Sequence, residues 1–214
     1  EYTAARNGTS VMDLTPMGKY EITGDHAHRF VDYLVTRDLS EMKDNTVAYI
    51  IWCNEDGKVI DDGTIFKFSS TKFMLCCAVK IYNWLNDSAY GFDVSISDVT
   101  DTIAALAIQG PTSCSTLKKF GATDLEKLKP FEMREYKIDG FDILISRTGF
   151  TGDLGYELWT DPKNAETTWD NIEIAGKELK LRPFGMHALE MTRIEAGFIQ
   201  TNTDFMAAED SLRP

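Results

Sequence analysis

The spacing of apolar and polar side chains along this chain predicts many short strands interrupted by amphipathic helices. Ala27, Phe30, Val31 and Leu34 recur at helical spacing, and Asp25 precedes them as the expected N-cap. Runs of β-branched and aromatic residues bounded by glycine, asparagine or aspartate predict strands. The expected strands cover residues 19–22, 47–53, 59–68, 72–78, 92–96, 103–108, 131–138, 141–146 and 156–160.

Further helices are expected where a start signal precedes an apolar face. Gly110-Pro111 would begin one helix with proline in its first position, and Asp161-Pro162 would cap another. Two more helices are expected around residues 81–86 and 186–196. The pairs Asp56-Gly57 and Asp139-Gly140 predict hairpin turns between neighbouring strands.

The order of these elements predicts two strand–helix–hairpin units in tandem. The segments that begin at Tyr20 and Leu106 both consist of a strand, a glycine and a helix start. Because helices and antiparallel strands are segregated, the fold class is α+β, with antiparallel sheets flanked by helices. We expect residues 20–101 to form a ferredoxin-like subdomain, and residues 1–19 plus 102–214 to form a second α+β subdomain.

Composition narrows the function classes. The 214 residues carry a net charge of −12, which argues against a nucleic-acid partner because such a surface needs a basic face. No apolar run is long enough to span a membrane. The four cysteines lack CxxC spacing and the three histidines form no ligand set, so no metal is expected. We expect a cytoplasmic location, where free thiols are the norm. The first residue, Glu1, and the irregular segment 199–214 suggest a fragment.

The segment 145–157 carries the richest candidate chemistry. Phe150 and Tyr156 could supply the faces of a slot, and Glu157 could accept two parallel N–H bonds from a planar heterocycle. The alternative is a glycine-containing hairpin whose aromatic residues belong to the core. Three glycines are expected to take positive φ and to let the backbone approach a flat ligand: Gly149, Gly152 and Gly155.

Two neighbouring carboxylates form a second candidate site. Asp61 and Asp62 lie on one strand, so their side chains point to opposite faces, and one of them can face a pocket. Tyr49 lies on the strand that pairs with theirs, so it can share a face with Asp61. The alternatives are a pair of solvated acids near a turn and a core tyrosine.

A third candidate is Arg193, on the last expected helix. Its guanidinium could bind a carboxylate in bidentate fashion. The alternative is an ion pair on the helix surface with Glu190 or Glu195.

Five segments in order resemble the glycine cleavage system T-protein family of aminomethyltransferases, which bind tetrahydrofolate. The resemblance covers essentially the whole chain and stops short of the family's C-terminal barrel domain. The segments are Val11-Met-Asp-Leu-Thr-Pro-Met-Gly-Lys-Tyr, Val59-Ile-Asp-Asp-Gly, Ala107-Ile-Gln-Gly-Pro, Arg147-Thr-Gly-Phe-Thr-Gly-Asp-Leu-Gly-Tyr-Glu and Arg193-Ile-Glu-Ala-Gly.

The resemblance implies a transferase that moves a one-carbon unit from an S- or N-bound donor to tetrahydrofolate. It implies that Asp61 is catalytic, that Glu157 holds the pterin edge, and that Tyr49, Phe150 and Arg193 belong to the folate site. We therefore expect one pterin-shaped crevice lined by Asp61 and Glu157. The implied partners are folate and a small-molecule or carrier-bound donor, for which a lipoyl carrier protein is one candidate.

Departures from the family pattern leave the donor open. Leu189 stands where the family has an arginine, and Cys76-Cys77-Ala78 replaces the usual Val-Val-Asn strand. The alternatives are a folate-dependent demethylase, acting on dimethylsulfoniopropionate or on methylamines, and a folate-binding protein without transferase activity.

Overall fold

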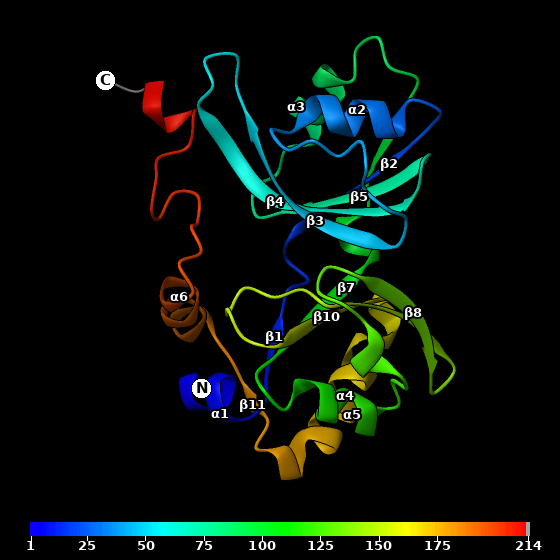
Figure 1. Ribbon diagram of the computed structural model, residues 1–214, viewed down its shortest axis with the longest axis vertical. Coiled ribbons are helices and arrows are strands. Elements are labelled where there is room, and N and C mark those ends of the chain that lie inside the picture. Colours follow the sequence, from blue (N-terminus) through cyan, green and yellow to red (C-terminus); the bar gives the residue numbers. More distant parts are fainter. Residues whose placement is uncertain (213–214) are drawn as a thin grey trace. The chain divides into compact units, whose positions relative to one another are not determined.

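The computed structural model describes residues 1–212 and divides the chain into two compact units (Figure 1). We call the first the loop unit; it comprises Glu1–Pro16 and Asp101–Phe198. The second, the aspartate unit, comprises Met17–Thr100 and the chain from Ile199 onward. The expected division placed the segment after residue 198 in the second subdomain, which corresponds to the loop unit. It joins the aspartate unit because the Ala208 N–H donates to the Val59 carbonyl, at 2.7 Å.

The aspartate unit is a five-stranded antiparallel sheet with two helices on one face. Its strand order is β3-β4-β5-β2-β6. The helices pack on the face that carries Tyr20, Ile50 and Trp52, and together they form one apolar core. The elements are β2 (Gly18–Thr23), α2 (Ala27–Leu34), β3 (Thr46–Cys53), β4 (Val59–Ser69), β5 (Lys72–Cys77), α3 (Tyr82–Ser88) and β6 (Ser95–Asp98).

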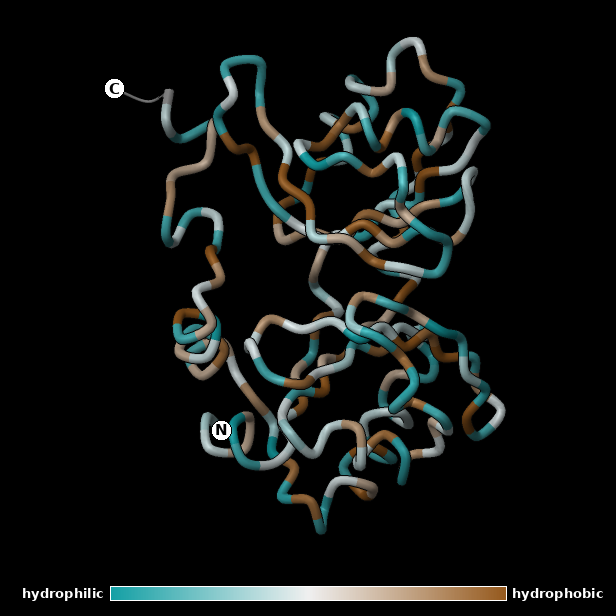
Figure 2. Tube along the Cα trace, viewed as in Figure 1, coloured by the Kyte–Doolittle hydropathy of each residue, from teal (hydrophilic) through white to brown (hydrophobic). Residues whose placement is uncertain are grey.

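Helix α2 shows where local pattern succeeds and where it fails. All four residues of its expected apolar face are buried, and its trace alternates between brown and teal turns in Figure 2. The expectation that Asp25 caps it is wrong, because His26 occupies the N-cap. The first turn is closed by backbone instead, since the Ala27 N–H donates to the Gly24 carbonyl at 3.1 Å.

The loop unit is a six-stranded sheet in the order β11-β1-β7-β10-β9-β8. Helices α4 and α5 cover one face, and the core between them and the sheet contains Ile108, Tyr156 and Leu158. The elements are α1 (Tyr2–Asn7), β1 (Ser10–Asp13), β7 (Ala104–Gln109), α4 (Ser113–Phe120), β8 (Met133–Ile138), β9 (Phe141–Ser146), β10 (Gly155–Thr160), α5 (Ala165–Gly176), β11 (Arg182–Pro183) and α6 (Met186–Glu195).

The two sheets repeat one topology. The order β3-β4-β5-β2 in the aspartate unit matches β8-β9-β10-β7 in the loop unit, and a helix follows β2 and β7 alike. The tandem strand–helix–hairpin fold and the α+β class are thereby confirmed. Local details differ from the prediction: α4 begins at Ser113 behind an N-cap at Thr112, later than Pro111, and β6 begins at Ser95.

Candidate functional site

A glutamine side chain organises the glycine loop, the connection 147–154 between β9 and β10. Gln109 lies fully buried at the end of β7, and its Nε2 donates to the carbonyls of Thr148 and Tyr156, at 3.3 and 3.2 Å. Its Oε1 accepts a hydrogen bond from the Thr151 hydroxyl at 3.2 Å. The loop is therefore folded around one amide that the sequence did not single out, although the Ala-Ile-Gln-Gly-Pro segment contains it.

Two glycines of this loop, Gly149 and Gly152, and Gly155 at the start of β10 are required for space more than for backbone conformation. A Cβ atom on Gly149 or on Gly155 would lie 2.0 Å from Gln109 Oε1, far inside van der Waals contact. Of the three glycines, Gly152 alone takes a positive φ, of 73°, and its Cβ would lie 2.3 Å from the Ala196 Cβ. The expectation of positive φ is therefore wrong for Gly149 and Gly155.

Glu157 is a partly buried carboxylate on the face of the sheet opposite α4 and α5. Its neighbours along β10, Tyr156 and Leu158, belong to the helix-covered core, so Glu157 projects to the other side. The Thr148 hydroxyl donates to its Oε2 at 2.6 Å. Burial raises the pKa of this carboxyl above its ordinary range, against the opposing effect of the Thr148 bond. A carboxylate held this way retains hydrogen-bonding capacity for a ligand.

The aromatic pair beside the loop differs from the expected one. Tyr156 is 1% exposed and lies within the core, so it cannot form a slot wall next to Glu157. Phe150 instead stacks on Phe198, with ring centroids 5.5 Å apart and an interplanar angle of 24°. The second ring thus comes from the segment after α6, where no local pattern marked it.

Arg193 supports this aromatic pair from α6. Its guanidinium is buried, and its Nε and Nη2 both donate to the Glu190 carboxylate. Its Nη1 donates to the Phe198 carbonyl at 2.9 Å. The ion pair with Glu190, weighed as the alternative reading of this residue, is therefore present, and the same side chain fixes the backbone that carries Phe198.

Asp61 lies on the helix-covered face of the aspartate unit. It is fully buried on β4, directly opposite Trp52 on β3. Its Oδ2 accepts a hydrogen bond from the Val79 N–H at 3.2 Å. Among the described residues, its Oδ1 and the Trp52 Nε1 are buried without a partner. Burial raises the pKa of the Asp61 carboxyl, as expected for a charge removed from water.

Tyr49 and Asp62 occupy the opposite face of the same sheet. The register pairs Tyr49 with Thr64, so the expectation that Tyr49 shares a face with Asp61 is wrong. Its hydroxyl donates to Asp62 Oδ2 at 2.7 Å, and the Thr201 hydroxyl donates to Asp62 Oδ1 at 2.9 Å. Burial and the bond to Asp62 raise the pKa of Tyr49.

The predicted residues therefore fall into three groups. Phe150 and Arg193 come together around Phe198, Glu157 lies at the base of the glycine loop, and Asp61 lies in the aspartate unit. That Asp61 and Glu157 line one crevice stays a prediction, since the two residues belong to different units.

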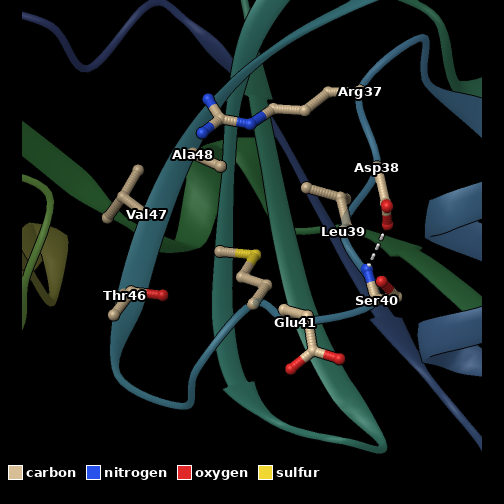
Figure 3. Close-up of a pocket in the computed structure, with 9 residues that line it drawn as sticks. Arg37, Asp38, Leu39, Ser40, Glu41, Thr46, Val47 and Ala48 are labelled. Atoms are coloured by element: carbon tan, nitrogen blue, oxygen red, sulfur yellow. Dashed lines mark hydrogen bonds between the residues drawn. The ribbon is translucent and has the colours of Figure 1, made fainter.

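A surface hollow of about 310 Å³ on the aspartate unit contains none of these residues. Figure 3 shows its lining, which comes from the loop before β3 and from the start of that strand. Within residues 1–212, no group of three histidine, cysteine or acidic side chains is arranged to hold a metal ion. No helix of the described chain has both the length and the apolar composition that crossing a bilayer requires.

Comparison with known proteins gives consistent matches along the chain. The GCVT N-terminal domain family matches residues 1–213. Enzymes named Aminomethyltransferase are similar: one from Clostridium botulinum is 39% identical over 204 residues, 93% of this chain and 55% of the relative. One from Thermoanaerobacter pseudethanolicus is 38% identical over 202 residues, 92% of this chain and 55% of the relative. The chain thus spans about half the length of these relatives.

Solved structures share the fold. The glycine cleavage system aminomethyltransferase T from Bartonella henselae superposes with a TM-score of 0.85 at 22% identity, covering 95% of this chain and 55% of that one. A heterotetrameric sarcosine oxidase from Corynebacterium superposes with a TM-score of 0.62 at 13% identity, over 84% of this chain and 89% of that one.

Proposed function

The chain belongs to the family of GCVT N-terminal domains, and we propose that it serves in the transfer of a one-carbon unit from an S- or N-bound donor to tetrahydrofolate. The observation that carries this proposal is the Glu157 carboxylate. It is partly buried on the face of the sheet opposite α4 and α5, accepts a hydrogen bond from Thr148, and is flanked by a loop built around Gln109. Such a group can recognise the N–H edge of a planar heterocycle.

Binding of folate would draw on the loop unit. Glu157 would accept two N–H bonds from the pterin edge, since an ionised carboxylate has the acceptor capacity for parallel bonds. Phe150, held against Phe198 at 5.5 Å, would contribute a flat apolar surface. Arg193 would act through the Phe198 backbone that it bonds.

Catalysis would draw on Asp61. In this proposal its carboxylate orients and polarises the reacting folate amine and stabilises the positive charge that develops at the transferred carbon. The unpartnered Oδ1 and the raised pKa fit a carboxyl group that exchanges partners or a proton during turnover. Holding folate and donor together would supply much of the remaining rate enhancement.

The donor in this proposal is an aminomethyl group on a lipoyl carrier protein, because the curated relatives are named Aminomethyltransferase. Leu189, which stands where the resembled family has an arginine, packs against the cluster of Ala5, Phe184 and Ala188. An apolar side chain there removes a cationic contact that an anionic donor could use. Dimethylsulfoniopropionate, whose carboxylate would miss that contact, and N-methyl amines are the competing donors.

The test is a calorimetric titration with tetrahydrofolate followed by parallel assays of the three donor classes. We expect binding, and transfer from the aminomethylated carrier. Transfer from dimethylsulfoniopropionate or a methylamine instead would make the protein a demethylase. Binding without turnover of any donor would make it a folate-binding protein, and absence of binding would refute the proposal.

A further inference from the structure

The Arg6 side chain joins three segments of the loop unit that are far apart in sequence. From α1, its Nη1 donates to the Thr151 carbonyl in the glycine loop at 2.8 Å. Its Nη2 donates to the Thr192 carbonyl in the last turn of α6 at 3.0 Å. Its Nε and Nη2 also donate to the Glu195 carboxylate, at 3.0 and 2.6 Å. One guanidinium therefore bonds the loop and the helix simultaneously.

Arginine is suited to this arrangement for a geometric reason. The guanidinium is planar and directs its N–H groups along fixed, diverging lines, whereas a lysine ammonium is a compact charge with three donors at one point. The Arg6 side chain is 21% exposed, while the Glu195 side chain is 47% exposed. The two carbonyl bonds are the better shielded from water, so we expect them to matter more than the ion pair.

The segments that Arg6 joins carry the aromatic pair. The loop approaches α6 so closely that a Cβ on Gly152 would lie 2.3 Å from the Ala196 Cβ. Within the same contact, the ring of Phe150 stacks on that of Phe198. The relative position of the two rings thus depends on the loop and the helix end being held together.

We propose that Arg6 is a positioning residue that holds the glycine loop against the end of α6, so that Phe150 and Phe198 are stacked before folate binds. The inference rests on the proposed function, because the pterin is the ligand that the stacked pair would receive. Pre-organisation of this kind raises affinity by removing the ordering cost of the loop. Arg6 itself touches no reacting atom.

Three variants separate fork geometry from charge. Arg6→Lys keeps the charge and loses the diverging donors, Arg6→Ala loses both, and Glu195→Gln keeps both carbonyl bonds. We expect Arg6→Lys and Arg6→Ala to weaken tetrahydrofolate binding at least about tenfold, with kcat at saturating folate unchanged, and Glu195→Gln to weaken it about threefold or less. The matched control is Lys119→Ala, which removes the ion pair with Glu178 on the same unit and is expected to change nothing.

Two outcomes would overturn the inference. One is wild-type folate affinity in Arg6→Lys. The other is a lower unfolding temperature in Arg6→Ala with unchanged folate affinity, which is the result of a purely structural tie. If wild-type protein binds no tetrahydrofolate, the proposed function fails instead. Amide hydrogen exchange in residues 147–154 then still tests whether Arg6 holds the loop against α6. We expect Arg6→Ala to speed this exchange at least about tenfold.

A variant at a different residue tests the same contact even if the Arg6 variants do not fold. Gly152→Ala pushes the loop away from Ala196 without altering Arg6. It is expected to weaken folate binding by a similar factor, and the double variant by less than the product of the two single losses, because both act on one contact. Independent, multiplicative losses would contradict the shared role.

Discussion

The β4–β5 connection and the β9–β10 connection hold the same place in the same strand order, yet they differ greatly. In the aspartate unit residues 70–71 complete the turn, since Ser69 pairs directly with Lys72. In the loop unit residues 147–154 fill the same step and carry Phe150 and two of the glycines. The repeated sheet determines the architecture, whereas the longer connection carries the candidate chemistry, as loops on rigid scaffolds commonly do.

A shared requirement lies beneath this difference. Gly24 and Gly110 directly follow the matching strands β2 and β7, with φ of 135° and 118°. A Cβ on either would lie 2.4 Å from a backbone carbonyl oxygen, that of Asp93 or that of Gly8. The same strand-to-helix step therefore excludes a side chain in both units.

The proposal assigns catalysis to the aspartate unit and folate binding to the loop unit, so the largest expected effect on turnover is at Asp61. Asp61→Asn keeps the shape and removes the charge, so turnover should fall at least about 100-fold while tetrahydrofolate still binds. Steady-state kinetics and calorimetry check the two parts. The matched control is Asp62→Asn on the opposite face. Full turnover in Asp61→Asn would refute the catalytic role, and a loss confined to Asp62→Asn would move it to the face of Tyr49.

The position of Tyr49 shows what sequence can and cannot supply. Alternation correctly predicts that Asp61 and Asp62 point apart, but which of them accompanies Tyr49 depends on the register of two strands. That register is set by the turn at residues 54–57 and by an irregularity between Trp52 and Cys53, neither of which alternation reveals.

The residues that sequence reasoning missed act over long separations in the chain. Gln109 contacts the loop some forty positions away, and Arg6 contacts Thr151 and Glu195 from the other end of the loop unit. The apolar face of α2, by contrast, is a local property and is confirmed residue by residue. Periodicity encodes which side of an element is buried; it does not encode which distant side chain meets it.

A stability measurement sharpens the role assigned to the loop glycines. Gly155→Ala would place a methyl group 2.0 Å from Gln109 Oε1 and 2.3 Å from its Cδ, so we expect a loss of about 3 kcal/mol in unfolding free energy, typical of severe overpacking. In the aspartate unit, Gly57→Ala meets no atom within 4 Å and is expected to cost about 1 kcal/mol through its φ of 74°. Urea unfolding compares them, and equal losses would contradict crowding around Gln109.

The binding role of the loop unit is tested at Glu157. Glu157→Gln keeps the acceptor for Thr148 and replaces the second carboxylate oxygen by a donor, so folate affinity should fall by about 2 kcal/mol, or about 30-fold. The control is Glu135→Gln, an exposed carboxylate on β8 of the same sheet. Titration calorimetry gives both affinities. Similar values for the two variants would show that Glu157 does not contact the ligand.

The smallest expected effect is on the pH dependence of the unfolding free energy. The contribution of Glu157 should have the opposite sign to that of a carboxylate in an ion pair. Burial raises the folded-state pKa of Glu157, so the folded protein retains a proton that the unfolded chain releases near pH 4.3. The stabilising contribution is complete below that pH and is lost as the pH rises through the folded pKa. Glu157→Gln, which cannot ionise, should therefore gain stability relative to wild type as the pH rises from about 4 through the folded pKa of Glu157, measured by urea midpoints. A constant difference across that window would show that the carboxylate is ionised at little cost. Glu157 would then lack the stability cost expected of a binding-site carboxylate that is partly buried in the ligand-free protein.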